Sequence, residues 1–136
     1  MSTSEQNLDA AAVRRTLELI TAAWRAGRSQ EMASVLDEQV VMAFPGFVGF
    51  VEGRQALIDS FVEFAREAQV HDYRQGEVRV DGSGDVAVAQ HPFEMIYERD
   101  GSRWHSTGWD VWVFRRQGTG WLAVWRTMQA LAESRV

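Results

Sequence analysis

Cysteine and lysine are both absent from this chain of 136 residues, and each absence removes a class of chemistry. Without cysteine there are no disulfides, no thiolate nucleophiles and no sulfur-ligated metals. All 14 basic residues are arginine, which excludes a Schiff-base or nucleophilic lysine. The three histidines show neither HxH nor HExxH spacing. We therefore expect an activity that needs no metal and no cofactor.

Long apolar runs and basic patches are also missing. No stretch approaches the roughly 18 apolar residues of a membrane span, and the polar residues 1–7 lack a signal-peptide hydrophobic region. The net charge is −5 and there is no basic patch, so the sequence lacks the positive surface that nucleic-acid-binding proteins use. We expect a cytoplasmic protein that binds neither membrane nor nucleic acid. Its length predicts a single domain over residues 1–136, with residues 1–6 flexible.

The most specific local pattern is a β-hairpin over residues 86–115. Two stretches of alternating apolar and polar residues flank Asp100-Gly101, and Asp-Gly is a preferred pair for a type I′ turn. With this pair at the tip, His91 lies directly opposite Asp110 on one face of the hairpin. A loop of three to five residues would give another register. The first register opposes large rings to small residues three times: Phe93 to Gly108, Ala89 to Trp112, and Ala87 to Phe114.

Helical periodicity comes before the strands along the chain. Apolar residues from Val13 to Trp24 predict a helix over 6–26 that ends at Gly27. Ser29 is a candidate cap for a short second helix carrying Met32, Val35 and Leu36. A third helix follows Gly53, with its apolar side at Leu57, Ile58, Phe61, Val62 and Ala65. Strands are predicted at 39–44, 73–81, 86–98, 103–115 and 121–130. This order predicts an α+β fold, with the helices on one face of an antiparallel sheet.

Both faces of the predicted sheet are apolar. One face collects His91 and Asp110 with Phe93, Met95 and Trp112. If the last turn is a four-residue loop, that face continues through Trp121, Ala123, Trp125, Thr127 and Gln129. The opposite face carries Trp109, Val111, Val113, Leu122, Val124 and Met128. Because helices can cover only one face, we expect the opposite face to pack against a second copy as a homodimer.

His91 and Asp110 are the candidate catalytic residues. A mostly apolar cavity with a few converging polar groups is the usual site for a small ligand. In it, Asp110 would take or hold a proton beside a carbonyl, with His91 as its partner. The alternative is that the two groups only satisfy each other inside a core. The candidate substrate-binding residues are Trp112, Trp125, Phe93, Met95, Thr127, Gln129, Phe44, Phe61 and Trp24.

Five segments spread along the chain carry a family resemblance. They are 24–27, 53–57, 91–95, 109–114 and 120–125. They resemble the nuclear-transport-factor-2-like (NTF2-like) superfamily, in particular its SnoaL-like and ketosteroid-isomerase-like bacterial proteins. The resemblance implies a cone-shaped fold, in which a curved antiparallel sheet wraps around a long N-terminal helix with two further helices. It also implies a deep apolar pocket and, commonly, a sheet-to-sheet dimer.

The same resemblance gives Asp110 a possible role. It looks like the aspartic acid with which steroid isomerases donate a hydrogen bond to the substrate oxyanion. Their general base corresponds to Phe44 here and their oxyanion tyrosine to about Ile20, so two of the three groups differ. Epoxide hydrolases of the superfamily use an Asp-Arg-Asp set, whereas alternation predicts Arg126 on the outer face. Its polyketide cyclases use a single acid–base aspartate in the cavity.

These observations together predict a cofactor-free isomerase, cyclase or dehydratase. It would transfer a proton next to a carbonyl of a small apolar substrate, using Asp110 and His91. Two alternatives remain open. One is a non-catalytic module that binds an apolar ligand, and the other is a dimerisation scaffold with a filled cavity.

Overall fold

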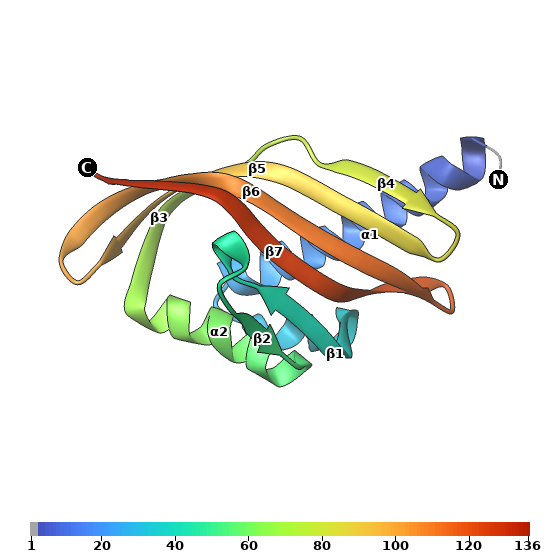
Figure 1. Ribbon diagram of the computed structural model, residues 1–136, viewed down its shortest axis with the longest axis horizontal. Coiled ribbons are helices and arrows are strands. Elements are labelled where there is room, and N and C mark those ends of the chain that lie inside the picture. The colour runs from blue at the N-terminus through green and yellow to red at the C-terminus, as the bar shows by residue number, and fades with distance from the viewer. Residues whose placement is uncertain (1–2) are drawn as a thin grey trace.

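The computed structural model describes residues 3–136. The chain begins with a long helix and ends in three long strands (Figure 1). The elements are α1 (Thr3–Arg25), the 3-10 helix η1 (Ser29–Val35), β1 (Leu36–Ala43), the 3-10 turn η2 (Pro45–Phe47), β2 (Phe50–Glu52), α2 (Arg54–Glu67), β3 (Ala68–Gln75), β4 (Arg79–Ser83), β5 (Val86–Arg99), β6 (Ser102–Gln117) and β7 (Gly120–Arg135). The predicted flexibility of residues 1–6 falls partly outside the described residues, and from Thr3 onward the backbone is helical.

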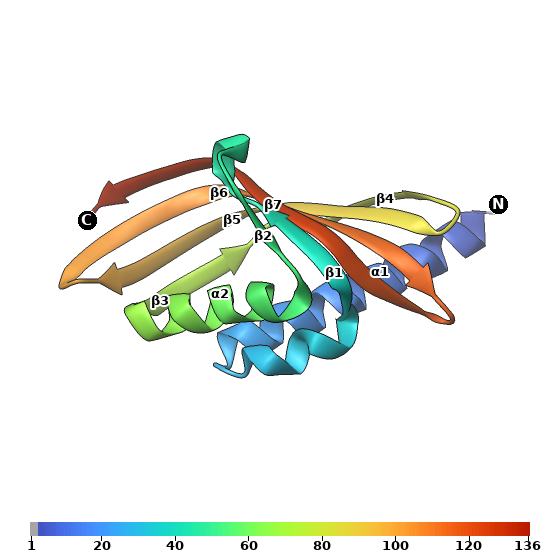
Figure 2. The ribbon, with the colours of Figure 1, turned by 60° about the horizontal axis from the view of Figure 1, so that its bottom comes forward.

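The strands form one curved sheet in the order β2-β1-β7-β6-β5-β3, with β4 pairing beside β3 on the edge of β5. Strand β1 runs parallel to β7, and the other neighbours are antiparallel. Both helices lie on one side of the sheet, which we call the inner face (Figures 1 and 2). No helix among the described residues is both long and apolar enough to cross a membrane. The predicted α+β fold is confirmed.

The β5–β6 hairpin has the predicted register throughout. Asp100 and Gly101 form its tip with φ of 53° and 77°, the left-handed values that a type I′ turn requires. His91 lies opposite Asp110. Each predicted ring-to-small pair is present, and Gly108 has a steric reason to lack a side chain. A Cβ there would lie 3.0 Å from the Phe93 ring and 2.8 Å from Leu131.

The inner face is packed most tightly beneath α1. The helix periodicity buries Val13, Leu17 and Ile20 to 1% exposure or less. They meet a layer of sheet residues in which rings of β6 lie beside alanines of β5 and β7. That layer consists of Ala87, Ala89, Trp112, Phe114, Trp121 and Ala123. This end of the sheet is a closed hydrophobic core.

The helix predictions need three corrections. The segment after Gly27 is a 3-10 helix without a side-chain cap, so Ser29 does not cap it, and Leu36 opens β1. In α2, the buried side runs through Leu57 and Ile58, whereas Val62 and Ala65 are exposed. Phe64 takes their place by packing edge-on against the Tyr97 ring, 5.7 Å away.

The strand predicted at 73–81 is two strands, β3 and β4. Both pair with β5, β3 along 93–99 and β4 along 86–90. Pro92 lies between these two stretches and has no N–H to donate, so the ladder cannot run through it. Gly76 instead donates its N–H to the Pro92 carbonyl at 2.9 Å, where a Cβ would lie 2.5 Å from the proline ring.

The predicted alternation along β7 is correct only up to Ala123. A β-bulge follows, because Phe114 pairs with Ala123 whereas Val113 pairs with Trp125, which leaves Val124 as an extra residue. From there the faces are exchanged relative to the prediction. Arg126 and Met128 lie on the inner face, opposite Trp112 and Asp110. The prediction that Trp125, Thr127 and Gln129 lie on the inner face is therefore wrong. The prediction that Met128 and Arg126 lie on the outer face is wrong for the same reason.

Candidate functional site

The other half of the inner face is not filled by α1. Here α2, η2 and the sheet enclose a cavity of about 280 Å³. Its wall is mostly apolar, with six aromatic rings. The residues that line it are Trp24, Met42, Ala43, Phe44, Pro45, Ser60, Phe61, Phe64, Tyr73, Phe93, Met95, Asp110, Arg126 and Met128.

Asp110 and Arg126 form a buried ion pair at the wall of this cavity. The arginine Nε donates to Oδ1 at 2.9 Å and Nη2 donates to Oδ2 at 3.3 Å. The indole N–H of Trp112 also donates to Oδ2, at 3.2 Å. The two charged side chains are only about one-tenth exposed, 10% for Asp110 and 9% for Arg126. Three hydrogen bonds therefore fix the carboxylate in position and compensate for its burial.

Arg126 lies close to two aromatic rings. Its guanidinium carbon lies 5.0 Å from the centre of the Phe61 ring and 5.1 Å from that of Trp112. The remaining terminal nitrogen, Nη1, contacts the Met42 sulfur at 3.4 Å. A thioether is a weak acceptor. Arg126 therefore retains strong donor capacity that faces the cavity it lines.

His91 lies beside Asp110 but does not line the cavity. Its Nε2 is 3.8 Å from Asp110 Oδ2, too far for a hydrogen bond. Its Nδ1 lies 3.0 Å from the Pro92 carbonyl; a carbonyl only accepts, so Nδ1 carries the proton. The ring is 1% exposed and its Nε2 has no hydrogen-bond partner. His91 can thus influence a bound molecule only through Asp110.

Tyr73 is the third polar group at the cavity. It lies on β3 opposite Met95 and packs between Trp24, in an edge contact of 5.0 Å, and Phe93, stacked at 6.4 Å. Burial, together with the negative charge of Asp110, raises the pKa of the Tyr73 phenol to about 12. Arg126 and Arg25 act on this pKa in the opposite sense. The hydroxyl therefore keeps its proton at neutral pH and is available as a donor.

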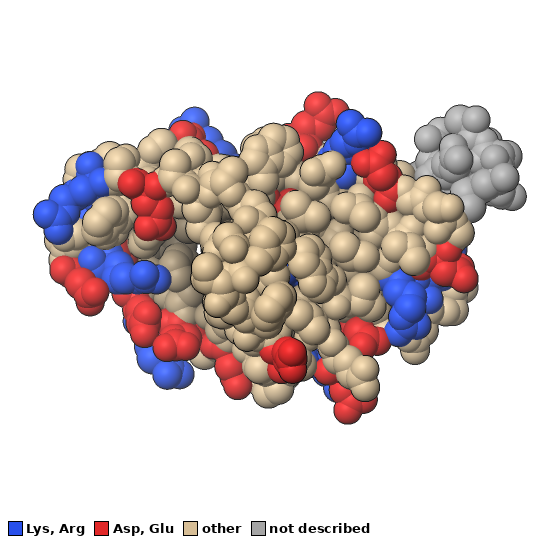
Figure 3. All heavy atoms as spheres, in the orientation of Figure 1, with Lys and Arg blue, Asp and Glu red and all other residues tan. Residues whose placement is uncertain are grey.

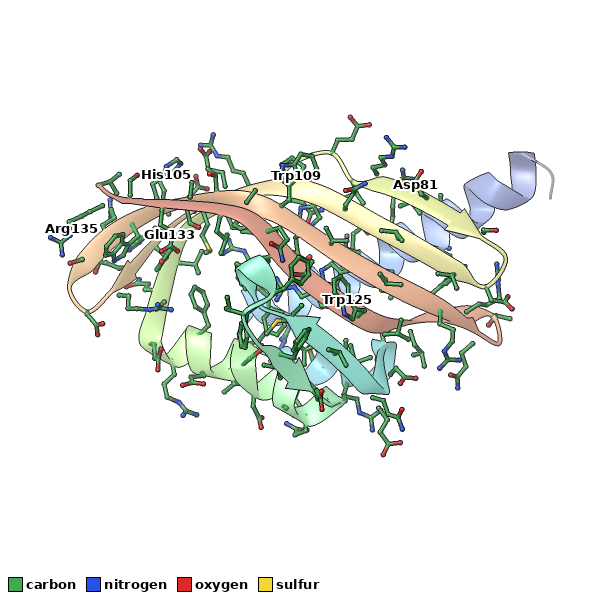
Figure 4. All side chains as sticks on the ribbon, in the orientation of Figure 1. Asp81, His105, Trp109, Trp125, Glu133 and Arg135 are labelled. Carbon is green, nitrogen blue, oxygen red and sulfur yellow. The ribbon has the colours of Figure 1, made fainter. Side chains whose placement is uncertain are left out.

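The structure brings only part of the predicted site together. Of the candidate substrate-binding residues, Phe93, Met95, Phe44, Phe61 and Trp24 line the cavity with Asp110. Trp112 does not line the cavity, but it donates a hydrogen bond to Asp110, which does. The three candidates beyond the bulge lie on the outer face, where Figure 4 labels Trp125 together with Trp109.

Thr127 and Gln129 have a structural task on that outer face. Thr127 donates its hydroxyl proton to the Ala43 carbonyl at 2.9 Å and accepts from Gln129 Nε2 at 2.8 Å. The Gln129 oxygen accepts the Gly46 N–H at 3.0 Å. This chain of bonds ties η2 to β7. Since Phe44 and Pro45 line the cavity, it also sets the position of the cavity's rim.

Sequence reasoning missed Arg126, Tyr73, Met42, Ala43, Pro45, Phe64, Ser60 and Met128 as cavity residues. For Arg126 and Met128 the sequence held no signal, because the run Leu122-Ala123-Val124-Trp125 is apolar without interruption and a bulge within it leaves the alternation unchanged. Tyr73 stood in a stretch assigned to one strand instead of two. Among the described residues, no three His, Asp or Glu side chains gather as a metal site.

Comparisons with known proteins agree with this architecture. A family model, the SnoaL-like domain, matches residues 13–121. A search of the curated proteins found no match. Among solved structures, a candidate scytalone dehydratase from Novosphingobium aromaticivorans has a TM-score of 0.85 at 11% identity, covering 99% of this chain and 92% of that one. A ketosteroid isomerase-like protein from Erwinia carotovora atroseptica has a TM-score of 0.72 at 16% identity, covering 88% and 93%.

A third solved structure, an NTF2-like protein with a cystatin-like fold from N. aromaticivorans, has a TM-score of 0.72 at 21% identity, over 92% of this chain and 83% of that one. At such identities these likenesses establish the fold alone. The family-model match covers most of the chain, from the first buried turn of α1 to the start of β7. The protein belongs to the SnoaL-like domain family of the NTF2-like fold.

Proposed function

We propose that this protein is a cofactor-free enzyme that transfers a proton next to a carbonyl group of a small, largely apolar compound held in the cavity. One observation carries the proposal: a carboxylate, a guanidinium and a protonated phenol meet at the wall of an otherwise apolar cavity of about 280 Å³. A few polar groups converging on an apolar space are typical of small-ligand sites. Dehydratase and isomerase names among the structural neighbours point to the same class of chemistry.

Each polar group has a distinct task in this proposal. Asp110 is the base; Oδ1 accepts one bond from Arg126 and keeps a second acceptor position free. Arg126 and Tyr73 donate to the carbonyl oxygen, which gains negative charge as the carbon loses its proton. Phe93, Phe61 and Trp24 exclude water, so the two donors act in a medium of low dielectric constant. Arg126 and Trp112 keep Asp110 in place, and His91 packs beside it without a hydrogen bond.

Hydrogen–deuterium exchange on a model ketone tests this assignment. In D₂O, the protein should accelerate deuterium incorporation at the α-carbon of 2-tetralone, followed by NMR, without any added cofactor. Asp110→Asn should abolish the acceleration, because an amide cannot take up the proton, while ketone binding by calorimetry persists. Full exchange activity in Asp110→Asn would refute the role of Asp110.

A non-catalytic binding module is the second candidate, and one observation favours it. Asp110 already accepts three hydrogen bonds, two of them from a cation, so only one acceptor position remains to take up a substrate proton. Under this alternative, 2-tetralone binds and quenches tryptophan fluorescence but is not deuterated faster than in buffer. The cavity beside Asp110 argues against the third possibility, a scaffold with a filled interior.

We also propose that the outer face of the sheet packs against a second copy of the chain. Viewed from this side, the centre of the molecule shows few charged groups, and most of them lie toward its edges (Figure 3). The proposed contact consists of Trp109, Val111, Val113, Leu122 and Val124, without the inward-facing Met128. Trp109 is 45% exposed. Light scattering at micromolar concentration should give the mass of a dimer, and Trp109→Glu that of a monomer; a monomeric wild type would contradict the proposal.

A further inference from the structure

The cavity offers a bound molecule more hydrogen-bond donors than acceptors. Asp110, its strongest acceptor, already accepts three hydrogen bonds from Arg126 and Trp112, which leaves one acceptor position free, on Oδ1. Ser60 donates its single proton to the Leu57 carbonyl at 2.6 Å, so it has none to give. Tyr73, in contrast, makes no hydrogen bond to any described residue, and Arg126 Nη1 meets only a sulfur. A matching ligand must therefore supply oxygen acceptors.

The charges around Tyr73 favour a negative group. Three charged side chains act on its hydroxyl: Asp110 from β6, Arg126 from β7 and Arg25 at the end of α1. Arg25 also lies over the Trp24 and Tyr73 rings, 5.6 Å from the centre of each. Asp110 and Arg126 pair with each other, whereas Arg25 forms no ion pair with a described residue and is the unpaired charge beside the phenol. An anionic head would compensate it, whereas a cationic one would not.

The apolar part of the wall favours a flat body. Rings of Trp24, Phe44, Phe61, Phe64 and Phe93 line the cavity together with that of Tyr73. Aromatic rings pack best against other flat rings, in offset-stacked or edge-on arrangements. The volume of about 280 Å³ lies at the lower end of the range of ligand pockets, which indicates a small body of roughly two fused rings at most.

We propose that the molecule bound here is a small aromatic compound with an ionised oxygen head, a carboxylate or an ionised enol, held by Tyr73 and Arg126. This inference rests on the proposed function and narrows its substrate class from any apolar carbonyl compound to an acidic one. It also gives Tyr73 the task of choosing the ligand by charge. The head lies against the two donors, and the flat body lies among the rings.

Two probes of equal shape and different charge test the inference. 2-Naphthoate carries a carboxylate at neutral pH, and 2-naphthamide replaces it with a neutral amide on the same ring system. Titration calorimetry should show the carboxylate binding about tenfold more tightly, the usual gain from a hydrogen bond to a charged group. Tyr73→Phe should remove most of that preference while leaving 2-naphthamide binding within about twofold.

Ser60→Ala is the matched control, because Ser60 lines the same cavity but its proton is engaged with Leu57. It should keep the preference for 2-naphthoate. Equal binding of both probes, or an unchanged preference in Tyr73→Phe, would overturn the inference. Tighter binding of 2-naphthamide would overturn it too, yet leave the proposed function standing, since a neutral carbonyl compound would still occupy the cavity. If neither probe binds, the inference fails, whereas the proposed function fails only if 2-tetralone is not deuterated faster than in buffer.

Discussion

The inner face of the sheet has two halves, and in both a large ring lies opposite a small residue on the neighbouring strand. One half is a closed core, whereas the other is the wall of a cavity. In the closed half, under α1, rings of Trp112 and Phe114 stack at 6.3 Å and are 1% exposed or less. In the open half, Phe93 faces Gly108 just as Phe114 faces Ala87, but its ring borders the cavity. The ion pair of Asp110 and Arg126 lies where the halves meet.

The difference between the halves lies in what covers the sheet. Above the closed half, the buried row of α1 formed by Val13, Leu17 and Ile20 fills the space that the alanines leave. Above the open half, the cover comes from α2 and from Trp24 at the end of α1, with Phe44 and Pro45 at the rim, and it encloses space instead of filling it. Ring-to-small pairing across strands thus produces a smooth sheet surface in both halves. Whether that surface becomes core or cavity wall depends on the layer above it.

The largest expected effect comes from truncating one ring in each half. Phe114→Ala should cost about 3–5 kcal/mol of unfolding free energy, because it opens a void in a closed core. Phe93→Ala should cost roughly 1–2 kcal/mol less, since it enlarges a space that already exists. Urea denaturation of the two variants measures both values. Equal losses would show that the open half is as tightly packed as the closed half.

The second prediction concerns the boundary between the halves. Arg126→Met should destabilise the protein by about 3–5 kcal/mol, because it leaves Asp110 charged, buried and unpaired. The double variant Asp110→Leu/Arg126→Met should recover most of that loss, since two apolar side chains then replace the pair. Both values follow from denaturant titrations.

Arg115→Met is the control for that experiment. Arg115 also forms an ion pair, with Asp37 at 2.7 Å, but its side chain is 46% exposed. Removing it should change the stability by no more than about 1 kcal/mol. If Arg115→Met costs as much as Arg126→Met, burial is not what makes the Asp110–Arg126 pair important.

The sequence was sufficient wherever local rules decide the structure. Asp100-Gly101 determines the turn, and with the turn comes the register that places His91 opposite Asp110. The helix periodicity identifies the buried row of α1 for the same reason, because each position follows from its neighbours. The fold class follows from the order of such segments and was correctly predicted.

Prediction failed where a distant strand decides. Pro92 of β5 divides a neighbouring stretch into β3 and β4, an effect invisible from residues 73–81 themselves. The bulge at Val124 lies in an unbroken apolar run, where a shift of one residue leaves the pattern unchanged. That single residue moves Arg126 into the cavity and moves Thr127 and Gln129 out of it. Asp110 therefore lines the cavity as expected, its catalytic role stays a prediction, and the residues around it were foreseen only in part.

The smallest expected effect is on the pH dependence of the unfolding free energy at alkaline pH. It involves two tyrosines of the inner face, Tyr73 and Tyr97. In the open half, the pKa of Tyr73 is raised to about 12 by burial and Asp110. Near the end of β5, the pKa of Tyr97 is also raised to about 12, by burial and by the hydrogen bond of 2.7 Å that its hydroxyl donates to Glu133. Unfolded tyrosine loses its proton near pH 10. Between pH 10 and 12 the folded state thus holds protons that the unfolded state has released, and stability falls as pH rises.

Each of these tyrosines contributes at most about 1.4 kcal/mol per pH unit to that slope. Tyr73→Phe and Tyr97→Phe should each flatten the fall of unfolding free energy between pH 10 and 12, and both should leave the pH dependence from 7 to 9 unchanged. Denaturation at a series of pH values measures this.

A ligand anion bound at the Tyr73 hydroxyl would hold the phenolic proton more firmly still. Saturating 2-naphthoate should therefore move the fall in stability that is due to Tyr73 to higher pH, and leave the fall that is due to Tyr97 in place. A slope that Tyr73→Phe does not alter would mean that this phenol is as well hydrated in the folded protein as in the unfolded chain, and that the open half is open to water.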